Sequence, residues 1–169
     1  MKAESFRIGT GAGFSADRLD PAVDLARRGD LDAIVFECLG ERTLASGLLE
    51  KRSDPALGYN RLLETRMRAV LPLCHAGNTC LITNMGAANP LAAGKAVVDV
   101  ARELGLRGMR VAVVTGDDAT HLLGKDTHLV EPNCTLQDFE HRMIGANAYL
   151  GTEGIVAALE QKADVVITG

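Results

Sequence analysis

The sequence has no tryptophan, and aromatic residues make up only 4% of its 169 positions. A surface that stacks nucleic-acid bases is therefore not expected, because such surfaces are built from aromatic side chains. The net charge is -4, and no block of the chain is rich in lysine and arginine. Nucleic-acid binding needs a basic patch that meets the phosphates, so we predict no nucleic-acid partner.

Long apolar runs are also missing. No run approaches the roughly 20 residues that cross a bilayer, so we expect no membrane partner. The first residues carry no apolar segment of the kind found in secretory signals. No two cysteines are spaced C-x-x-C, so we interpret all four as reduced thiols of a cytoplasmic protein: Cys38, Cys74, Cys80 and Cys134.

What the chain does have is an alternation of short apolar runs with amphipathic helical segments. The apolar runs are typical of buried strands and occupy residues 6–8, 33–36, 80–83, 110–114 and 165–167. This β-α alternation predicts an α/β fold with three layers, in which helices cover both faces of a mostly parallel, Rossmann-like sheet of about five strands. We expect one α/β domain over residues 1–169.

Several helix boundaries can be predicted. Asp20-Pro21 and Asn89-Pro90 each combine a capping residue with a proline suited to the first helical turn. Pro72 should kink or end the helix that begins near residue 60. The stretch 135–138 resembles a capping box that opens a helix through Met143 and Ile144. Residues 119–133 have weak periodicity and are expected to form a lid or a contact surface.

Right-handed crossovers bring the carboxyl ends of parallel strands to one edge of the sheet, where ligands of such folds bind. The first of these ends is rich in glycine, with Gly9, Gly11 and Gly13 at alternate positions. We expect these glycines to form a loop with positive φ angles whose N–H groups hold an anion. The candidate residues of this loop are Gly11, Gly13, Ser15 and Arg18 for binding, and Asp17 for catalysis.

Acidic and amide side chains follow the other strands. Glu37 and Glu41 are the main candidates for acid/base catalysis, with capping of the next helix or metal ligation as the alternatives. Later loops add Asn84, Asn89 and Asp117 as candidate ligand-binding residues.

Two arginines are candidate anion clamps. Arg18 and Arg42 could each hold a carboxylate or phosphate, or could form surface pairs with Asp17 and Glu41. Cys38 stands where a nucleophile could act, but most cysteines in such positions are packed and inert, and we expect that here. The spacing of the histidines and cysteines fits no zinc pattern, so no metal site is predicted.

A dinucleotide site is the less favoured alternative. Residues 11–16 match G-x-G-x-x-A, and Glu37 ends the second strand, where a ribose-binding acid is expected. In that fingerprint the helix begins inside the glycine run, whereas Pro21 indicates a later start. A glycine-rich stretch that only permits close packing is the other possibility. We therefore rank a nicotinamide dinucleotide below other ligands.

Four segments carry a resemblance to a known family: residues 8–18, 32–43, 83–90 and 145–151. They resemble the N-terminal domain of the acyclic terpene utilisation family, formerly described as a domain of unknown function. The resemblance spans the whole chain. Because the family domain is longer, it implies that these residues are its N-terminal part. It also adds Asn147 and Tyr149 to the candidate binding residues; their alternative is a polar turn at a helix end.

The family is associated with gene clusters that degrade citronellol- and geraniol-type compounds through coenzyme A thioesters. The resemblance therefore implies a catabolic role, with a small carboxylate or an acyl thioester, such as an acyl-CoA, as substrate. The expected chemistry is that of a hydratase, lyase or isomerase, and the full-length protein is expected to be a homo-oligomer. A nucleotide-binding oxidoreductase and a non-catalytic assembly subunit are the alternatives.

Overall fold

The computed structural model describes residues 5–131, 133–139 and 142–169. Within this part the chain divides into two compact units. The larger unit comprises the residues up to Thr115 together with Thr152–Gly169, and the smaller unit is Gly116–Gly151. The predicted strands and most of the candidate site residues belong to the larger unit.

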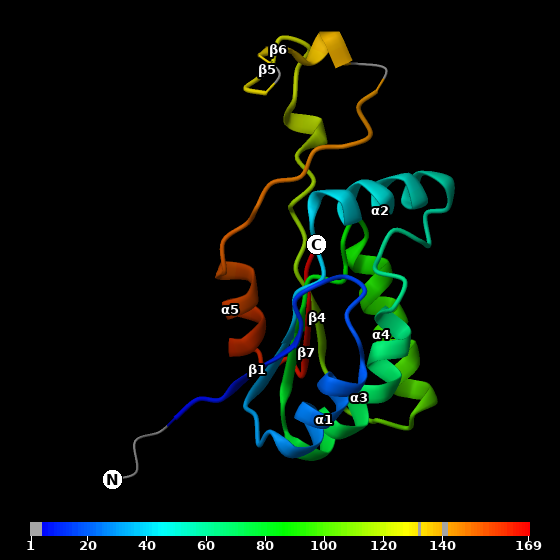
Figure 1. The fold of residues 1–169 in the computed structure, drawn as a ribbon, viewed down its shortest axis with the longest axis vertical. Helices are drawn as coiled ribbons and strands as arrows, with labels where there is room; N and C mark the ends of the chain where they lie inside the picture. Colours follow the sequence, from blue (N-terminus) through cyan, green and yellow to red (C-terminus); the bar gives the residue numbers. More distant parts are fainter. Residues whose placement is uncertain (1–4, 132, 140–141) are drawn as a thin grey trace. The chain divides into compact units, whose positions relative to one another are not determined.

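A five-stranded parallel sheet forms the centre of the larger unit (Figure 1). Its order is β1-β2-β3-β7-β4, so the last strand of the chain lies between the third and fourth. Every neighbouring pair is parallel. In this order the strands are Ile8–Ala12, Ala33–Phe36, Cys80–Thr83, Val165–Ile167 and Val111–Val113. The predicted α/β class with a mostly parallel sheet is confirmed.

Helices cover both faces of this sheet (Figure 1). Helices α1 (Asp20–Arg28), α3 (Leu63–Gly77) and α4 (Pro90–Glu103) pack side by side on one face. Helix α5 (Glu153–Glu160) contacts β7 on the other face, and α2 (Glu41–Ser53) lies at the carboxyl ends of the strands. The three-layer, Rossmann-like arrangement is therefore confirmed as well.

The core lies between the sheet and the three helices on its more fully covered face. Burying one such aliphatic or aromatic side chain stabilises the fold by about 1.5–3 kcal/mol. The fully buried side chains of this layer include Ile34, Phe36, Leu81, Ile167, Leu63, Met67, Val70 and Val97.

The structure corrects the prediction for the first glycines. Strand β1 continues through Gly9 and Gly11, so these residues are extended strand residues rather than loop residues. None of the glycines at positions 9, 11 and 13 has a positive φ. A Cβ added to Gly11 would approach the ring of Phe36 to 2.6 Å. Gly11 is therefore required by the close packing of β1 on the Phe36 ring, not by a turn.

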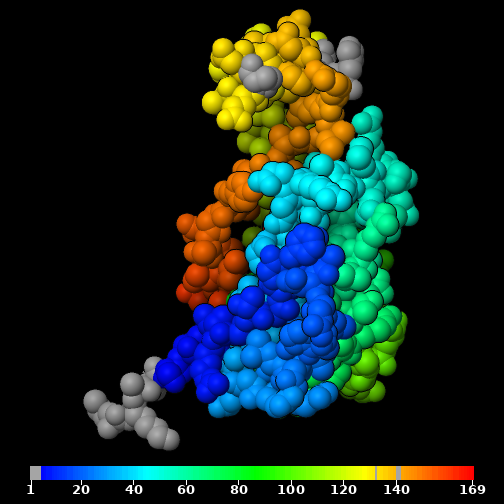
Figure 2. Space-filling model, in the orientation of Figure 1, coloured from blue at the N-terminus to red at the C-terminus, as the bar shows by residue number. Residues whose placement is uncertain are grey.

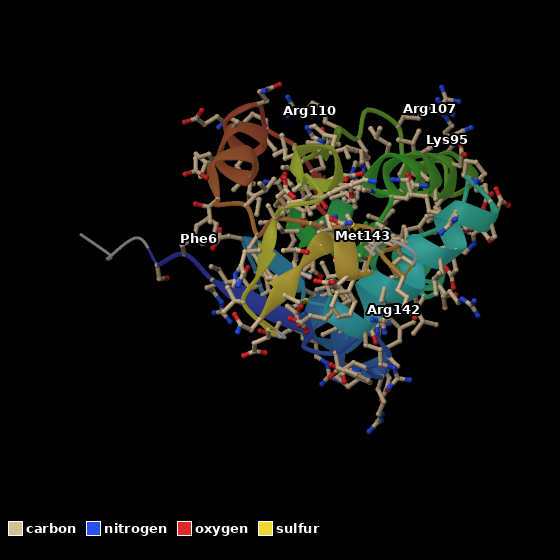
Figure 3. All side chains as sticks on the ribbon, turned by 90° about the horizontal axis from the view of Figure 1, so that it is seen from above. Phe6, Lys95, Arg107, Arg110, Arg142 and Met143 are labelled. Atoms are coloured by element: carbon tan, nitrogen blue, oxygen red, sulfur yellow. The ribbon has the colours of Figure 1, made fainter. Side chains whose placement is uncertain are left out.

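Phe6 was expected in the same apolar run but lies outside the strand. It precedes β1, is 71% exposed, and lies apart from the sheet (Figure 3). The basic side chains of Lys95 and Arg107 also point away from the sheet (Figure 3).

Helix α3 differs from the prediction at Pro72. The helix passes through Pro72 and ends at Gly77, and Asn78 follows with a left-handed φ of 53°. A proline inside a helix costs about 3 kcal/mol, because it removes one backbone hydrogen bond and crowds the preceding turn. Leu71 and Cys74 on either side of Pro72 are buried, and their burial offsets this cost. The prediction was a kink or an end at Pro72, and the end is wrong because the helix continues to Gly77.

The two predicted helix caps differ in outcome. Asn89 caps α4 as expected, because its side chain accepts a hydrogen bond from the Ala92 N–H at 3.4 Å. At α1 the cap lies one residue earlier than predicted, at Leu19, and the Asp20 carboxylate accepts hydrogen bonds from Arg18 instead.

The smaller unit contains short elements only. These are a 3-10 turn at Thr120–Leu122, a two-stranded pair of β5 (His128–Leu129) with β6 (Cys134–Thr135), and a second 3-10 turn at Leu136–Phe139. The Asp138 carboxylate accepts from the Thr135 N–H at 2.9 Å, as in a capping box. The helix predicted to follow through Met143 and Ile144 is not formed at these two residues, although residues 140 and 141 lie outside the described part.

Candidate active site

The loops that follow β1, β2 and β3 border a cavity of about 560 Å³ in the larger unit. Its walls come from residues 13–16, residues 37–43, the facing side of α2 as far as Glu50, residues 59–62, and Ala87. Figure 2 shows the loop after β1 lying against the segment that leads into α2. A cavity of this size suits a small-molecule ligand.

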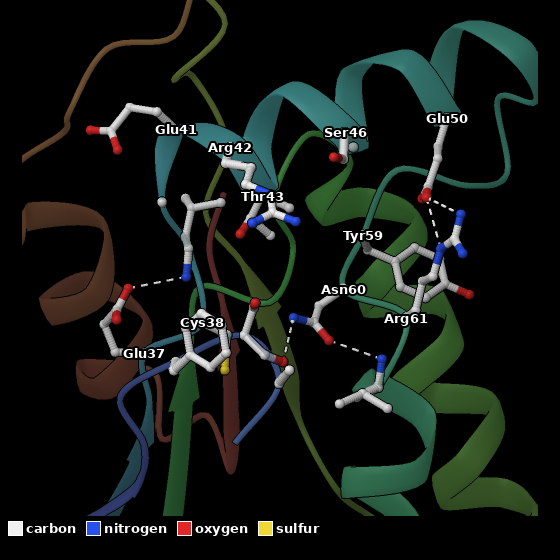
Figure 4. Close-up of a pocket in the computed structure, with 18 of the residues that line it drawn as sticks. Glu37, Cys38, Glu41, Arg42, Thr43, Ser46, Glu50, Tyr59, Asn60 and Arg61 are labelled. Atoms are coloured by element: carbon white, nitrogen blue, oxygen red, sulfur yellow. Dashed lines mark hydrogen bonds and ion pairs between the residues drawn. The ribbon is translucent and has the colours of Figure 1, made fainter. Parts of the chain in front are cut away.

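Glu37 lies at one side of this cavity and is held in place by two donors (Figure 4). Its Oε1 accepts hydrogen bonds from the Leu39 N–H and from Nδ2 of Asn84, each at 3.0 Å. Asn84 in turn accepts from the Cys38 N–H at 2.7 Å. The structure thus brings together two residues that the sequence analysis had placed on separate loops.

The first turn of α2 contributes Glu41 and Arg42. The N-cap of this helix is Gly40, which supplies no capping side chain, so the first N–H groups of the helix have no such partner. Figure 4 shows Arg42 pointing from α2 into the cavity, whereas the carboxylate of Glu41 is turned outward at its edge. The cation of Arg42 is therefore better placed than the carboxylate of Glu41 to meet a ligand.

The loop after β1 lines the cavity with Gly13 and Ser15. The N–H of Gly13 donates to the carboxylate of Asp17 at 2.8 Å, so the loop's own acid occupies this donor. Arg18 forms an ion pair with Asp20, and its side chain is 79% exposed. Of the residues proposed for this loop, the structure places Gly13 and Ser15 at the cavity and Arg18 in a surface pair.

The same loop lacks the geometry of a dinucleotide fingerprint. In that motif the helix starts within the glycine run, so that its N-terminus faces the pyrophosphate. Here α1 begins at Asp20, beyond the whole of the stretch 11–16. Gly11 is buried in β1 beneath Phe36 and does not border the cavity.

The remaining candidates are Asn89 of the larger unit and three residues of the smaller unit. Asn89 is 7% exposed, and its Nδ2 donates to the carbonyl oxygens of Pro55 and Leu57 at 2.8 and 2.7 Å. Asp117, Asn147 and Tyr149 belong to the smaller unit. There Asn147 donates to Asp117 at 2.7 Å, and Tyr149 is 91% exposed.

The sequence analysis missed residues 59–61, which lie between α2 and α3 and line the cavity. Asn60 accepts from the Leu62 N–H at 2.9 Å and donates to the Ser15 carbonyl at 3.4 Å, so it ties this segment to the first loop. Arg61 pairs with Glu50 of α2 at 2.6 Å. No motif identifies this segment, because its place at the cavity depends on the path that the chain takes after α2.

A buried arginine was also missed. Arg66 of α3 is 1% exposed, and its Nη1 donates to the sulfur of Cys38 at 3.0 Å. Burial raises the pKa of the Cys38 thiol from its ordinary 9.0 to about 11, although the nearby Arg66 charge acts in the opposite direction. Arg66 stands among the apolar positions of the α3 pattern, between Leu63 and Val70, and this placement was the available signal.

In residues 5–131, 133–139 and 142–169, no group of three or more histidine, cysteine, aspartate or glutamate side chains is arranged to hold a metal ion. Over the same residues, no helix combines the length and the apolar character needed to cross a membrane.

Comparison with known proteins identifies the family of the chain. The family model described as acyclic terpene utilisation family protein AtuA matches residues 6–169, which is nearly the whole chain. No curated protein and no solved structure matches at a significant level.

Proposed function

Because the chain belongs to the acyclic terpene utilisation family and so has a catabolic role, we propose that it is an enzyme that moves a proton on a branched-chain carboxylate or acyl thioester. The reaction class is that of a hydratase, lyase or isomerase. The observation that carries the proposal is the carboxylate of Glu37, held at the edge of a ligand-sized cavity by Asn84 and the Leu39 N–H.

Glu37 suits the role of acid/base catalyst for geometric reasons. Both of its hydrogen bonds fall on Oε1, so the carboxylate is oriented while Oε2 makes no hydrogen bond to the described residues. A positioned carboxylate with one oxygen available can remove a proton from a substrate carbon and return it elsewhere. Asn84 then acts as the residue that fixes the direction of this carboxylate.

The cavity also offers places for the two ends of such a substrate. Arg42 supports the binding of a carboxylate or of the oxygen of a thioester, and it replaces Arg18, which is paired with Asp20. Phe14 and Leu62 line the cavity although they are 61% and 38% exposed, and they suit an apolar branched chain. An acyl-CoA would enter as a substrate rather than as a resident cofactor.

Deuterium exchange tests this proposal. The intact protein is incubated in D₂O with 3-methylbut-2-enoyl-CoA, 3-methylbutanoyl-CoA and the corresponding free acids, and deuterium in the recovered acyl group is measured by mass spectrometry. We expect incorporation with at least one of these compounds, because a proton-transfer enzyme exchanges its substrate proton with solvent. Binding of several of these compounds without any incorporation would reject the proton-transfer role.

An assembly role is the second candidate. It is favoured by apolar side chains of the smaller unit that are largely exposed, such as Leu122 at 73% and Val130 at 84%. Under this proposal the protein forms a homo-oligomer through residues 119–133. Light scattering over a range of concentrations tests it, and a monomer mass throughout would reject it.

A further inference from the structure

The guanidinium of Arg66 reaches the loops that follow three neighbouring strands. Its Nη1 donates to Cys38 Sγ at 3.0 Å and to Met85 Sδ at 3.6 Å, and its Nη2 donates to the Asp17 carbonyl at 3.0 Å. The Nε of Arg66 has no hydrogen-bond partner in the described part of the chain. Two weak sulfur acceptors and one carbonyl therefore share a cation that is 1% exposed.

This charge has no close counter-ion. No carboxylate in residues 5–131, 133–139 or 142–169 lies within 4.0 Å of the Arg66 guanidinium, whereas other arginines of the chain form ion pairs on the surface. A buried charge without a paired opposite charge is costly. The guanidinium contacts Cys38, which lines the cavity, so its positive charge lies next to the cavity wall.

Cys38 stands between Arg66 and the cavity as a neutral thiol. Burial raises the pKa of its thiol to about 11, so the sulfur keeps its proton at neutral pH. The sulfur accepts the hydrogen bond of Arg66, which leaves the thiol proton free to point away from the guanidinium. A thiol whose sulfur accepts from a cation becomes a better donor, because successive hydrogen bonds polarise one another.

Charges of both signs lie around this end of the cavity. Arg42 points into the cavity from α2, and the carboxylate of Glu41 is turned outward (Figure 4). Glu50 is neutralised by its ion pair with Arg61 at 2.6 Å. In addition to burial, the carboxylates of Glu37 and Asp17 both act on Cys38, since each raises the pKa of its thiol, and the positive charge of Arg66 opposes them.

We propose that Arg66 and Cys38 form an oxyanion subsite in the floor of this cavity, in which the Cys38 thiol donates a hydrogen bond to the ligand and Arg66 supplies the compensating charge. The subsite deepens the proposed function and rests on it for the location of the substrate. It binds an oxygen anion of either a substrate carboxylate or a phosphate of a coenzyme A carrier. No covalent bond to Cys38 is formed.

The subsite is tested by thermal unfolding of the intact protein with two probes, sodium phosphate and sodium 3-methylbutanoate. The ionic strength is held constant with sodium chloride. We expect a saturable rise in melting temperature with at least one probe, because a ligand that binds only the folded state stabilises it in proportion to ln(1 + [L]/Kd). A response to 3-methylbutanoate assigns the subsite to the substrate carboxylate, and a response to phosphate assigns it to the carrier. No saturable response to either probe would overturn the subsite.

Variants then locate the binding. Cys38→Ser keeps a donor of similar size and should keep the affinity within a few fold, whereas Cys38→Ala should weaken it by about tenfold. Arg66→Met should weaken it at least as much. Arg68→Met is the matched control, because it removes the same charge from an exposed position on the same helix and should leave the affinity unchanged. Should Arg66→Met fail to fold, the two Cys38 variants still decide the question.

Equal affinity of Cys38→Ala and the wild-type protein would overturn the subsite. These measurements read binding without turnover, so the two proposals fail separately. If anion binding depends on Cys38 but the protein exchanges no deuterium, the subsite is retained and the proton-transfer role is rejected. If the protein exchanges deuterium but anion binding does not depend on Cys38, the proton-transfer role is retained and the subsite is rejected.

Discussion

The side-chain amide of Asn84 donates a hydrogen bond to Oε1 of Glu37 at 3.0 Å, and this contact joins the carboxyl ends of β2 and β3. The register of the sheet explains it. Phe36 and Thr83 are paired across the two parallel strands, so the residues that follow them emerge side by side. Asn84 also accepts from the Cys38 N–H at 2.7 Å, and one amide therefore orients both the acid and the backbone beside it.

Replacing Asn84 should separate these two roles. Asn84→Ala leaves the Cys38 N–H without its acceptor and should lower the free energy of unfolding by about 1–3 kcal/mol. Asn84→Asp keeps an acceptor but places a second carboxylate beside Glu37, so its destabilisation should be larger at pH 7 than at pH 4. Urea denaturation at both pH values measures this. In the double variant that combines Asn84→Asp with Glu37→Gln, the pH dependence of the destabilisation should disappear. If it persists, repulsion from Glu37 is not its cause.

Gly11 and Gly13 should respond differently to the same substitution. A Cβ on Gly11 would lie 2.6 Å from the buried ring of Phe36, whereas a Cβ on Gly13 meets no atom within 4 Å. Gly11→Ala should therefore lower the free energy of unfolding by about 1–3 kcal/mol, and Gly13→Ala should change it by less than about 0.5 kcal/mol. Urea denaturation compares the two variants. Equal losses would show that the packing of β1 on Phe36 is not what requires glycine.

The buried thiols should make the fold sensitive to alkali. Burial raises the pKa values of Cys38, Cys74 and Cys80 from 9.0 to about 11. Between these two pKa values the folded state keeps thiol protons that the unfolded chain releases. The stability that the protonated thiols contribute is therefore complete below pH 9 and is lost as the pH rises through about 11. Each thiol lowers the free energy of unfolding by at most about 1.4 kcal/mol per pH unit over this range.

Cys38→Ser tests this dependence. Urea denaturation at pH 8 and pH 10.5 should show a smaller loss of stability in the variant than in the wild-type protein, because one titrating thiol has been removed. Lysine and tyrosine titrations affect both proteins and cancel in the difference. An identical loss in the two proteins would contradict the raised pKa of Cys38.

The sequence was sufficient for the layers of the fold and for the placement of Glu37 and Asn84 at the carboxyl ends of their strands. Short runs rich in valine and isoleucine mark parallel strands, and a polar residue at the end of such a strand falls on the ligand edge. The prediction for the glycines was wrong because glycines at alternate positions are found both in loops with positive φ angles and in strands that pack closely against other residues. Gly9 and Gly11 relieve contacts with Leu31 and Phe36, and these partners are remote in sequence, so no local pattern identifies them.

Arg66 and Asn60 are residues whose contacts could not be predicted from the sequence pattern. A single arginine among the apolar positions of α3 marks an exception, but only the fold shows that it meets Cys38 and Asp17. Asn60 acts through the Ser15 carbonyl, a contact that depends on how α2 and the following residues return to the sheet. Pro72 is a different case: the local rule disfavours proline inside a helix, but burial of Leu71 and Cys74 offsets its cost and the helix continues.

The central claim is that Glu37 moves a proton on a substrate bound in the cavity, and its replacement by glutamine tests this most directly. Glu37→Gln can retain the hydrogen bonds to Leu39 and Asn84, so its melting temperature should stay within about 2 °C of that of the wild-type protein. The rate of deuterium incorporation should fall by about 10²–10⁴-fold, whereas Glu103→Gln, an exposed acid of α4, should keep the full rate. Retention of the exchange rate in Glu37→Gln, or a large loss of its stability, would contradict the claim.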